Sequence, residues 1–328
     1  MKAPRGQRVI GGIAVVVVLA IAALGLRSWL RRQPETEIAP LRVGYQPTML
    51  YLPLFVAQDK GFFDEESVKV KLVRFTSANE MAQALAARQL DATGMSSLTV
   101  LANLEANSSN IFRIYLLEVL TSKHSPDALI VKPDSTISAI GDLRGKKLGV
   151  HPGTTLQSYV EPILSKRIGP NHGVTVIPLA PHLQVQALAV GNVDALFVLE
   201  PIPTLAQIEL KARIVERALL ARSVHEPFYA GAGVLSREFV EKDPAKVIRF
   251  KAAMKKALHY ITTHEAEARR SLKSYAEVSA EVAEKMELVE WLDPADASLV
   301  DWKTSLRILE ELKLIPAGTK LEQYFHAN

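Results

Sequence analysis

The sequence predicts an α/β protein with two αβ lobes behind an N-terminal apolar helix. From residue 42 onward, strand-like and helix-like patterns alternate and form two series, each with an early strand followed by a polar turn. With 328 residues and 48% hydrophobic content, the chain can bury a sizeable core and favours two folding units over one. An unbroken apolar run with basic flanks stands before the first series.

The apolar run covers residues 9–26 and predicts a membrane anchor or a signal peptide. It contains 18 consecutive apolar or glycine residues, which is just long enough to span a bilayer. The run continues past the A-x-A-like site at 20–22 and is followed by Trp29 and a double arginine, so an uncleaved anchor is favoured over a cleaved signal peptide. Both of these alternatives export the body of the protein; a third alternative is a buried helix of a soluble protein. Residues 1–40 are therefore expected to be a signal-anchor helix and a linker, QPETEIAP.

The first αβ series opens with a strand over 42–45, the turn Gln46-Pro47-Thr48 and a helix that ends at Gly61. Half-buried alternation and helical spacing then indicate strands over 68–75, 91–95, 112–120 and 128–132, and helices over 78–88 and 98–105. Ser96 and Ser97 stand where they can cap the helix over 98–105.

The second series contains its own strands and helices and predicts a separate lobe over 123–219. Its strands are expected over 147–150, 174–178 and 195–199, and its helices over 137–143, 156–167, 183–190 and 202–209. A glycine-rich strand over 228–235 returns the chain to the first lobe, and from Asp243, a cap before Pro244, the pattern is helical almost to the end. The first lobe is therefore discontinuous and covers 41–122 and 220–328.

Composition and motif content argue against several functions. Part of the net charge of +4, and of the pI of about 9.1, comes from basic residues of the N-terminal segment. The rest of the chain is close to neutral and lacks the excess of positive charge expected of a nucleic-acid-binding protein. The absence of cysteine excludes disulfides, thiolate metal sites and a cysteine nucleophile. The eight histidines include no i, i+4 pair with a carboxylate partner on one helix, and no P-loop, G-x-S-x-G or G-x-G-x-x-G occurs. We therefore expect no metal, no cofactor and no catalytic residues.

Both series place hydroxyl groups and helix N-termini at strand ends. Gln46 and Thr48 follow the first strand of one series, and Thr154 and Thr155 follow an early strand of the other. Two lobes that face each other in this way form a cleft for a small polar or anionic ligand. The alternative for Thr154 and Thr155, as for Ser96 and Ser97, is a helix cap without ligand contact.

One carboxylate and several aromatic residues complete the candidate site. Glu200 follows a predicted strand and precedes Pro201, so it can face a ligand amine or ring N–H; its alternative role is a solvated charge at a helix start. Tyr51 starts a helix at the predicted cleft, and Tyr229 lies in the returning strand. Both can stack on a ligand or hydrogen-bond to it, although any single aromatic is more often part of the core.

Four segments in order resemble the periplasmic solute-binding proteins of the nitrate, sulfonate and taurine type, which are related to the thiamine-precursor (NMT1/THI5-like) group. They are AQDKGFFDEESVKV at 57–70, ARQLDA at 87–92, DLRGKKLGVHPGTT at 142–155 and LAVGNVDALFVLEP at 188–201. The resemblance covers about residues 41–239. It departs from the family pattern at Ser67 and Val68, at Leu199 in place of an aromatic residue, and in lacking a lipid-bearing cysteine.

The resemblance implies a type II-like periplasmic binding protein fold, whose two lobes close on a small ligand for an ABC permease in the inner membrane. By position, it implies ligand contacts from Gln46, Tyr51, Ser96, Ser97, Thr154, Thr155 and Glu200. The expected function is capture of a small anion or a zwitterion by a monomer in the periplasm, tethered by its N-terminal helix or released after cleavage. One alternative is a same-fold enzyme or binding protein for a pyrimidine or thiamine precursor. Another is an extracytoplasmic sensor, which would require a signalling domain.

Overall fold

The computed structural model describes residues 39–150 and 154–326, except for the side chains of residues 154 and 155. The predicted membrane or signal segment at 9–26 therefore lies outside the described residues. None of the helices within these residues combines the length and the apolar character needed to cross a bilayer. Residues 41–328 form one compact unit that contains two β-sheets.

Sheet A is a six-stranded mixed sheet built from both ends of the described chain. Strands β1, β2 and β3 are mutually parallel, whereas β10 runs antiparallel to both β3 and β4. The order across the sheet is β11 (Glu290–Leu292), β4 (Phe112–Leu120), β10 (Phe228–Ser236), β3 (Ala92–Ser97), β1 (Leu41–Tyr45) and β2 (Val70–Arg74).

Sheet B is a five-stranded mixed sheet built from the middle of the chain. Strand β6 pairs in parallel with β7 and β8, and β5 pairs in antiparallel orientation with β8 and β9. The order is β7 (Thr175–Pro178), β6 (Lys147–Val150), β8 (Ala195–Leu199), β5 (Asp127–Val131) and β9 (Arg213–Arg217). The predicted α/β class with two sheets is therefore confirmed.

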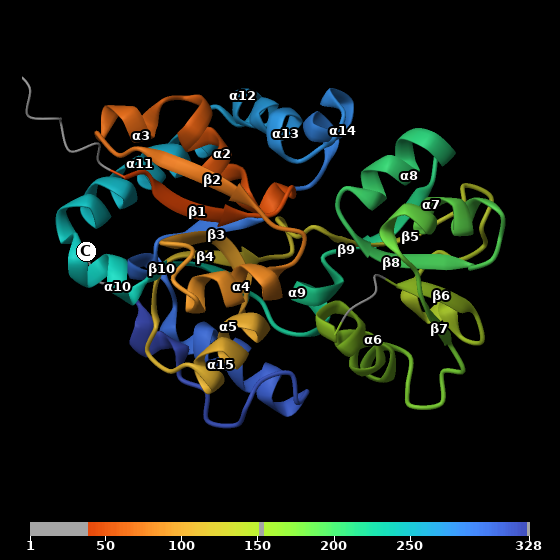
Figure 1. Cartoon of the computed structure of the whole chain (residues 1–328). Helices are drawn as coiled ribbons and strands as arrows, with labels where there is room; N and C mark the ends of the chain where they lie inside the picture. The colour runs from red at the N-terminus through yellow and green to blue at the C-terminus, as the bar shows by residue number, and fades with distance from the viewer. Residues whose placement is uncertain (1–38, 151–153, 327–328) are drawn as a thin grey trace, which may run out of the picture. The chain divides into compact units, whose positions relative to one another are not determined.

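Helices cover both faces of sheet A (Figure 1). One face carries α2 (Leu52–Asp59), α3 (Phe62–Glu65) and α11 (Pro244–Thr263), and the other carries α4 (Ala78–Ala86), α5 (Leu98–Asn107) and α15 (Leu299–Glu311). The remaining helices around this sheet are α10 (Arg237–Lys242), α12 (Glu265–Ala268), α13 (Arg270–Tyr275) and α14 (Ala280–Lys285), with the 3-10 turns η1 (Met49–Tyr51), η3 (Pro294–Asp296) and η4 (Leu321–Tyr324). Asp243 caps α11 by accepting from the Lys246 backbone N–H at 2.9 Å, as predicted.

Helices also lie on both faces of sheet B. Figure 1 shows α7 (Pro181–Ala189) and α8 (Ile202–Leu210) on one face, and α6 (Thr154–Arg167) and α9 (Leu219–Ser223) on the other. The predicted helix over 137–143 is a short 3-10 turn, η2 (Ile140–Leu143). A turn of this length forms because Asp142 accepts from the backbone N–H groups of Ser138 and Ala139 and so closes the loop on itself.

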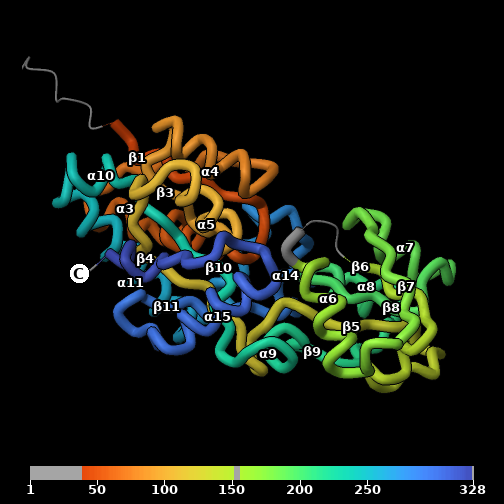
Figure 2. Tube along the Cα trace, turned by 90° about the horizontal axis from the view of Figure 1, so that it is seen from below, coloured from red at the N-terminus to blue at the C-terminus, as the bar shows by residue number. Residues whose placement is uncertain are grey.

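The chain passes between the two sheets twice, after β4 and after β9 (Figure 2). The carboxylate of Asp127 ties these two connections together. It accepts from the Ser125 hydroxyl on the first connection and, at 3.1 Å, from the Leu220 backbone N–H on the second. The predicted lobe boundaries near residues 122 and 220 fall within these two connections, and the division into lobes at these points stays a prediction.

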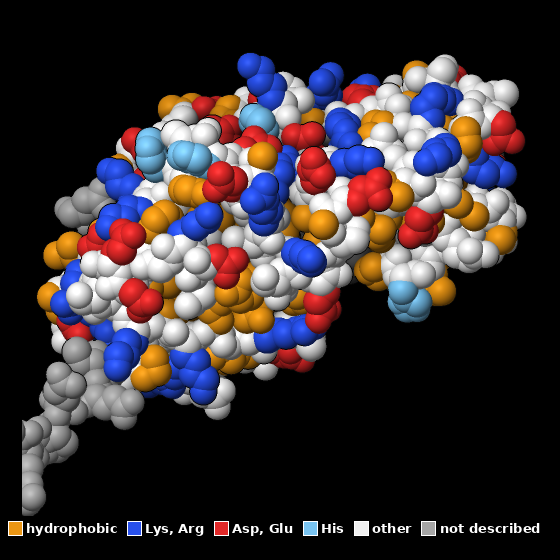
Figure 3. All heavy atoms as spheres, turned by 90° about the horizontal axis from the view of Figure 1, so that it is seen from above, with side chains coloured by type: hydrophobic (Ala, Val, Ile, Leu, Met, Phe, Trp, Pro, Cys, Tyr) orange, Lys and Arg blue, Asp and Glu red, His pale blue; other side chains and the backbone are white. Residues whose placement is uncertain are grey.

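Charged side chains of both signs are interspersed on the face shown in Figure 3. Charged side chains of the described residues also form ion pairs; Lys256 on α11, for example, contacts both Glu65 and Glu66 at 2.9 and 2.5 Å. Exposed pairs of this kind contribute little stability individually. The face in Figure 3 carries no extended patch of one sign.

Candidate ligand-binding site

The ends of all six strands of sheet A meet at one edge, which we call the site edge. Strands β1, β2, β3 and β4 end there, and the antiparallel strands β10 and β11 begin there. Ligands of open α/β sheets bind beside the carboxyl ends of strands. Most of the predicted site residues from the first lobe stand at this edge.

Gln46 and Tyr51 lie together at the site edge. The buried Tyr51 hydroxyl donates to the Met95 carbonyl oxygen at 2.8 Å and approaches the Gln46 side-chain oxygen at 3.4 Å, and the Gln46 amide donates to the Thr76 carbonyl at 3.2 Å. The ring fits against β3 because residue 94 is glycine; a Cβ there would approach the ring to 2.6 Å. Burial raises the pKa of the Tyr51 hydroxyl well above its ordinary value, so the group is held as a donor.

Ser96 and Ser97 have different surroundings although they are neighbours. The Ser97 hydroxyl caps α5 by accepting from the Val100 backbone N–H at 3.4 Å, and it lies 2.9 Å from the Thr99 hydroxyl. Ser96 is only 3% exposed, and among the described residues its hydroxyl has no hydrogen-bond partner. Ser97 therefore has a structural role, and Ser96 offers an unused polar group.

Glu118 is a residue of the site edge that sequence reasoning missed. It lies on β4 opposite Gly231 of β10, which in turn lies opposite Ser97 of β3. Glu118 is 6% exposed, and no described residue hydrogen-bonds to its carboxylate or forms an ion pair with it. Burial raises the pKa of Glu118 from its ordinary value of 4.5 to about 7. The only signal in the sequence is one carboxylate within the otherwise apolar run that ends this strand, YLLEVL.

Thr154 and Thr155 are the first two residues of α6, which directly follows the undescribed residues 151–153. The helix predicted over 156–167 therefore begins two residues earlier, and both threonines lie inside its first turn instead of before it. Their side chains lie outside what the structure describes, so their contact with a ligand stays a prediction.

Glu200 stands at the predicted strand end, after β8, but its carboxylate is already occupied. Its side chain is fully buried and accepts from the Arg217 guanidinium at 3.1 Å, the Thr204 backbone N–H at 3.2 Å and the Glu287 backbone N–H at 3.2 Å. Glu287 belongs to the segment before β11 of sheet A, so this carboxylate joins the two sheets. The alternative role, a solvated charge at a helix start, holds in one part: Glu200 accepts from the Thr204 backbone N–H in the first turn of α8. The solvation is wrong, because the side chain is fully buried. A ligand contact from Glu200 stays a prediction that would require one of these three donors to be displaced.

Tyr229 is a core residue. It is 1% exposed, its ring meets Trp302 of α15 edge to face with ring centroids 5.4 Å apart, and its hydroxyl accepts from the Ser298 backbone N–H at 3.0 Å. These contacts lie on the α15 side of sheet A, and they account for the buried ring and for the hydroxyl oxygen as an acceptor. The prediction of a ligand contact from Tyr229 has no support in these contacts.

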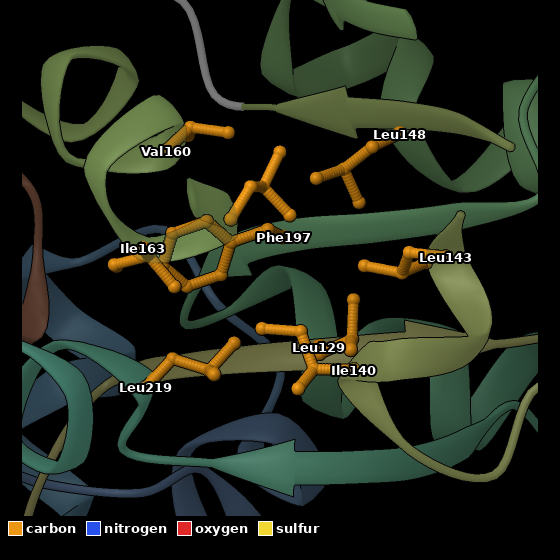
Figure 4. A pocket seen from close by; sticks show the side chains of 9 residues that line it. Leu129, Ile140, Leu143, Leu148, Val160, Ile163, Phe197 and Leu219 are labelled. Carbon is orange, nitrogen blue, oxygen red and sulfur yellow. The ribbon is translucent and has the colours of Figure 1, made fainter. Parts of the chain in front are cut away.

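Sheet B and its helices enclose a small apolar space (Figure 4). Its volume is about 10 Å³, which is the size of one water molecule at most, and a wholly apolar space of this size stays dry. The side chains that line it are those of Leu129, Ile140, Leu143, Leu148, Val160, Ile163, Leu164, Phe197 and Leu219. This space is part of the core and is too small for a ligand.

A larger cavity of about 240 Å³ lies between α11 and the segment that contains β11 and η3. Basic side chains of α11 line one side, and Asp293 and Asp296 line the other. Burial lowers the pKa of one of the basic groups, Lys251, whose ammonium donates to the His326 carbonyl at 3.2 Å. None of the eight predicted site residues lines this cavity. Across the described part of the chain, no cluster of histidine and carboxylate side chains could hold a metal ion.

Known proteins resemble this chain both in sequence and in fold. A protein of Bacillus subtilis named for a proposed role in binding aliphatic sulfonates is 26% identical over 258 residues, which cover 77% of this chain and 74% of that protein. A 4-amino-5-hydroxymethyl-2-methylpyrimidine phosphate synthase of Saccharomyces cerevisiae is 22% identical over 240 residues, which cover 69% and 68% of the two chains.

Among solved structures, the periplasmic aliphatic sulphonate binding protein SsuA from Escherichia coli matches with a TM-score of 0.70 at 17% identity, covering 88% of this chain and 92% of that chain. This match confirms the predicted two-lobe fold of periplasmic binding proteins. The family model described as NMT1/THI5 like matches residues 49–268, which is more than half of the chain. The chain therefore belongs to the NMT1/THI5-like family.

Proposed function

We propose that this protein is the extracytoplasmic substrate-binding component of an ABC importer and captures a small organic anion or zwitterion of the sulfonate type. The observation that carries this proposal is the site edge, where polar residues stand at or near the ends of three strands: Gln46 after β1, Ser96 in β3 and Glu118 in β4. The sequence relative from Bacillus subtilis and the structural neighbour from Escherichia coli are both named for binding aliphatic sulfonates, which supports the choice of ligand.

The proposed mechanism is lobe closure. The site edge of sheet A supplies one half of the ligand contacts, and Thr154 and Thr155 at the start of α6 supply the other half from the side of sheet B. A ligand that contacts both halves stabilises the closed arrangement over the open one, by as much as its affinities for the two arrangements differ. The permease then recognises the closed form.

A second candidate function is binding or conversion of an aminopyrimidine. The yeast relatives favour it, since their names describe synthesis of an aminopyrimidine phosphate. The groups that the structure gathers at the site edge are an amide, hydroxyls and a carboxylate. This set is suited to recognition of an aminopyrimidine by hydrogen bonds.

We propose that the protein works on the outer side of the inner membrane as a monomer, tethered by residues 9–26. If so, the full-length protein should fractionate with membranes and keep its N-terminal peptides in mass spectrometry. A soluble form that begins near residue 23 would instead show cleavage of a signal peptide.

A thermal-shift screen of the purified full-length chain tests the ligand class. The panel contains aliphatic sulfonates, nitrate, bicarbonate, aminopyrimidines and polyamines. A ligand that binds only the native state raises its stability by RT ln(1 + [L]/Kd), or about 2.7 kcal/mol at a hundredfold excess over Kd. We expect the sulfonates to raise the melting temperature. A shift with aminopyrimidines alone would support the second candidate, and no shift with any sulfonate would contradict the first.

A further inference from the structure

We propose that Glu118 receives a positively charged or N–H-bearing nitrogen of the ligand, which makes the ligand an amine-bearing anion such as an aminosulfonate. This inference rests on the proposed binding function and narrows its ligand class. It assigns recognition of the amine to the sheet A side of the site.

The first argument is that Glu118 is a buried residue whose carboxylate has no protein partner. Glu118 is 6% exposed, and among the described residues no hydrogen bond or ion pair to its carboxylate occurs. Its two oxygens are not among the fully buried side-chain atoms without a partner, so they keep the exposure that contact with a ligand requires. A largely buried carboxylate without a partner is costly and calls for an explanation. A cationic nitrogen of a ligand would supply the missing partner.

The second argument is the position of the carboxylate at the site edge. A Cβ on Gly231 would lie 2.4 Å from the nearer Glu118 carboxylate oxygen and 2.9 Å from the Ser96 carbonyl. The carboxylate therefore lies across β10 next to the end of β3, and only a glycine at position 231 leaves room for it. The Glu118 charge also contributes to the raised pKa of Tyr51, as expected for groups that lie near each other.

The third argument is a comparison with the other candidate carboxylate. Glu200 accepts three hydrogen bonds, one of them from the Arg217 guanidinium, so its charge is already balanced. Binding a ligand cation there would first require these bonds to break. Glu118 has no hydrogen bond to lose, so it can bind the ligand amine more readily than Glu200 can.

Two ligands that differ only in the amine test the inference. The probes are 2-aminoethanesulfonate and ethanesulfonate, titrated calorimetrically into the full-length protein and into Glu118→Gln. We expect the wild-type protein to prefer the aminosulfonate, and Glu118→Gln to lose about tenfold to a hundredfold in affinity for it, the range for a hydrogen bond to a charged group. Binding of ethanesulfonate should change little.

Further variants keep the test decisive. Glu118→Asp retains the charge and should keep part of the preference, and Glu311→Gln, at an exposed position on α15, serves as the matched control. Thermal unfolding checks that each variant folds. An unchanged preference in Glu118→Gln, or its loss in Glu200→Gln alone, would overturn the inference while leaving the proposed function intact. If neither probe nor any other sulfonate binds the wild-type protein, the proposed function fails, and the inference fails with it.

Discussion

Glu118 should make the stability of the protein depend on pH between about 4.5 and 7. The folded state raises the pKa of this carboxyl from 4.5 to about 7, so over this range the folded protein holds a proton that the unfolded chain has released. The free energy of unfolding therefore falls as pH rises through the range. The difference between the two pKa values corresponds to a loss of about 3 kcal/mol in the free energy of unfolding.

Glu118→Gln isolates this effect, because glutamine does not titrate. We expect the variant to be more stable than the wild-type protein by up to about 3 kcal/mol above pH 7, and the two to be similar near pH 4. Urea unfolding at several pH values measures the difference. Parallel curves at all pH values would show that the carboxyl titrates normally in the folded state.

Tyr229→Phe tests whether Tyr229 belongs to the core. The substitution keeps the ring against Trp302 but removes the oxygen that accepts from the Ser298 backbone N–H. We expect a loss of about 1 to 2 kcal/mol in the free energy of unfolding, with no change in ligand affinity. Weaker ligand binding at unchanged stability would instead return Tyr229 to the site.

At the scale of single elements, the start of α5 gives a test of the cap at Ser97. An alanine at an N-cap costs about 1 kcal/mol, whereas a glycine costs only a few tenths. If Ser97 acts only as the cap, Ser97→Ala should be less stable than Ser97→Gly by roughly this difference. Both variants should then bind ligand as tightly as the wild-type protein in calorimetry. If the Ser97 hydroxyl contacted the ligand, the contact would be lost in both variants and both would bind more weakly than the wild-type protein.

The sequence predicts strands both from apolar runs and from alternation of apolar and polar residues. Those over 112–120, 147–150 and 195–199 match β4, β6 and β8 at both ends, and most of their residues are buried. Strand β9 was missed, since Arg213–Arg217 has charged residues at three of five positions and forms the edge of sheet B. Strand β11 has three residues and exists only through its pairing with β4.

The strands that the sequence reveals, and those that it does not, also decide which site residues could be predicted. Gln46 and Tyr51 follow a recognisable strand and turn, and the structure brings them together at the site edge. The partner of Glu200 could not be predicted, because Arg217 lies on the missed strand β9. Whether a carboxylate has a partner depends on contacts between distant segments, and a single sequence does not contain them.

For the whole molecule, Asp127 should be one of the most sensitive positions. Asp127→Ala removes the acceptor of the Leu220 backbone N–H and of the Ser125 hydroxyl, which join the two connections between the sheets. We expect the free energy of unfolding to fall by about 2 to 4 kcal/mol, since each buried donor left unsatisfied costs about 1 to 3 kcal/mol. Chemical denaturation measures the loss, and Asp134→Ala, at an exposed position, is the control. Equal stability of the two variants would contradict this role.

The bond network of Asp127 also constrains how the two sheets can move. One carboxylate holds the end of the first connection to the start of the second, so the two connections are linked at this point. Glu200 provides a second link between the sheets through the Glu287 backbone N–H. A movement of one sheet relative to the other that separates either set of groups must break these hydrogen bonds, so movements that keep both links are favoured.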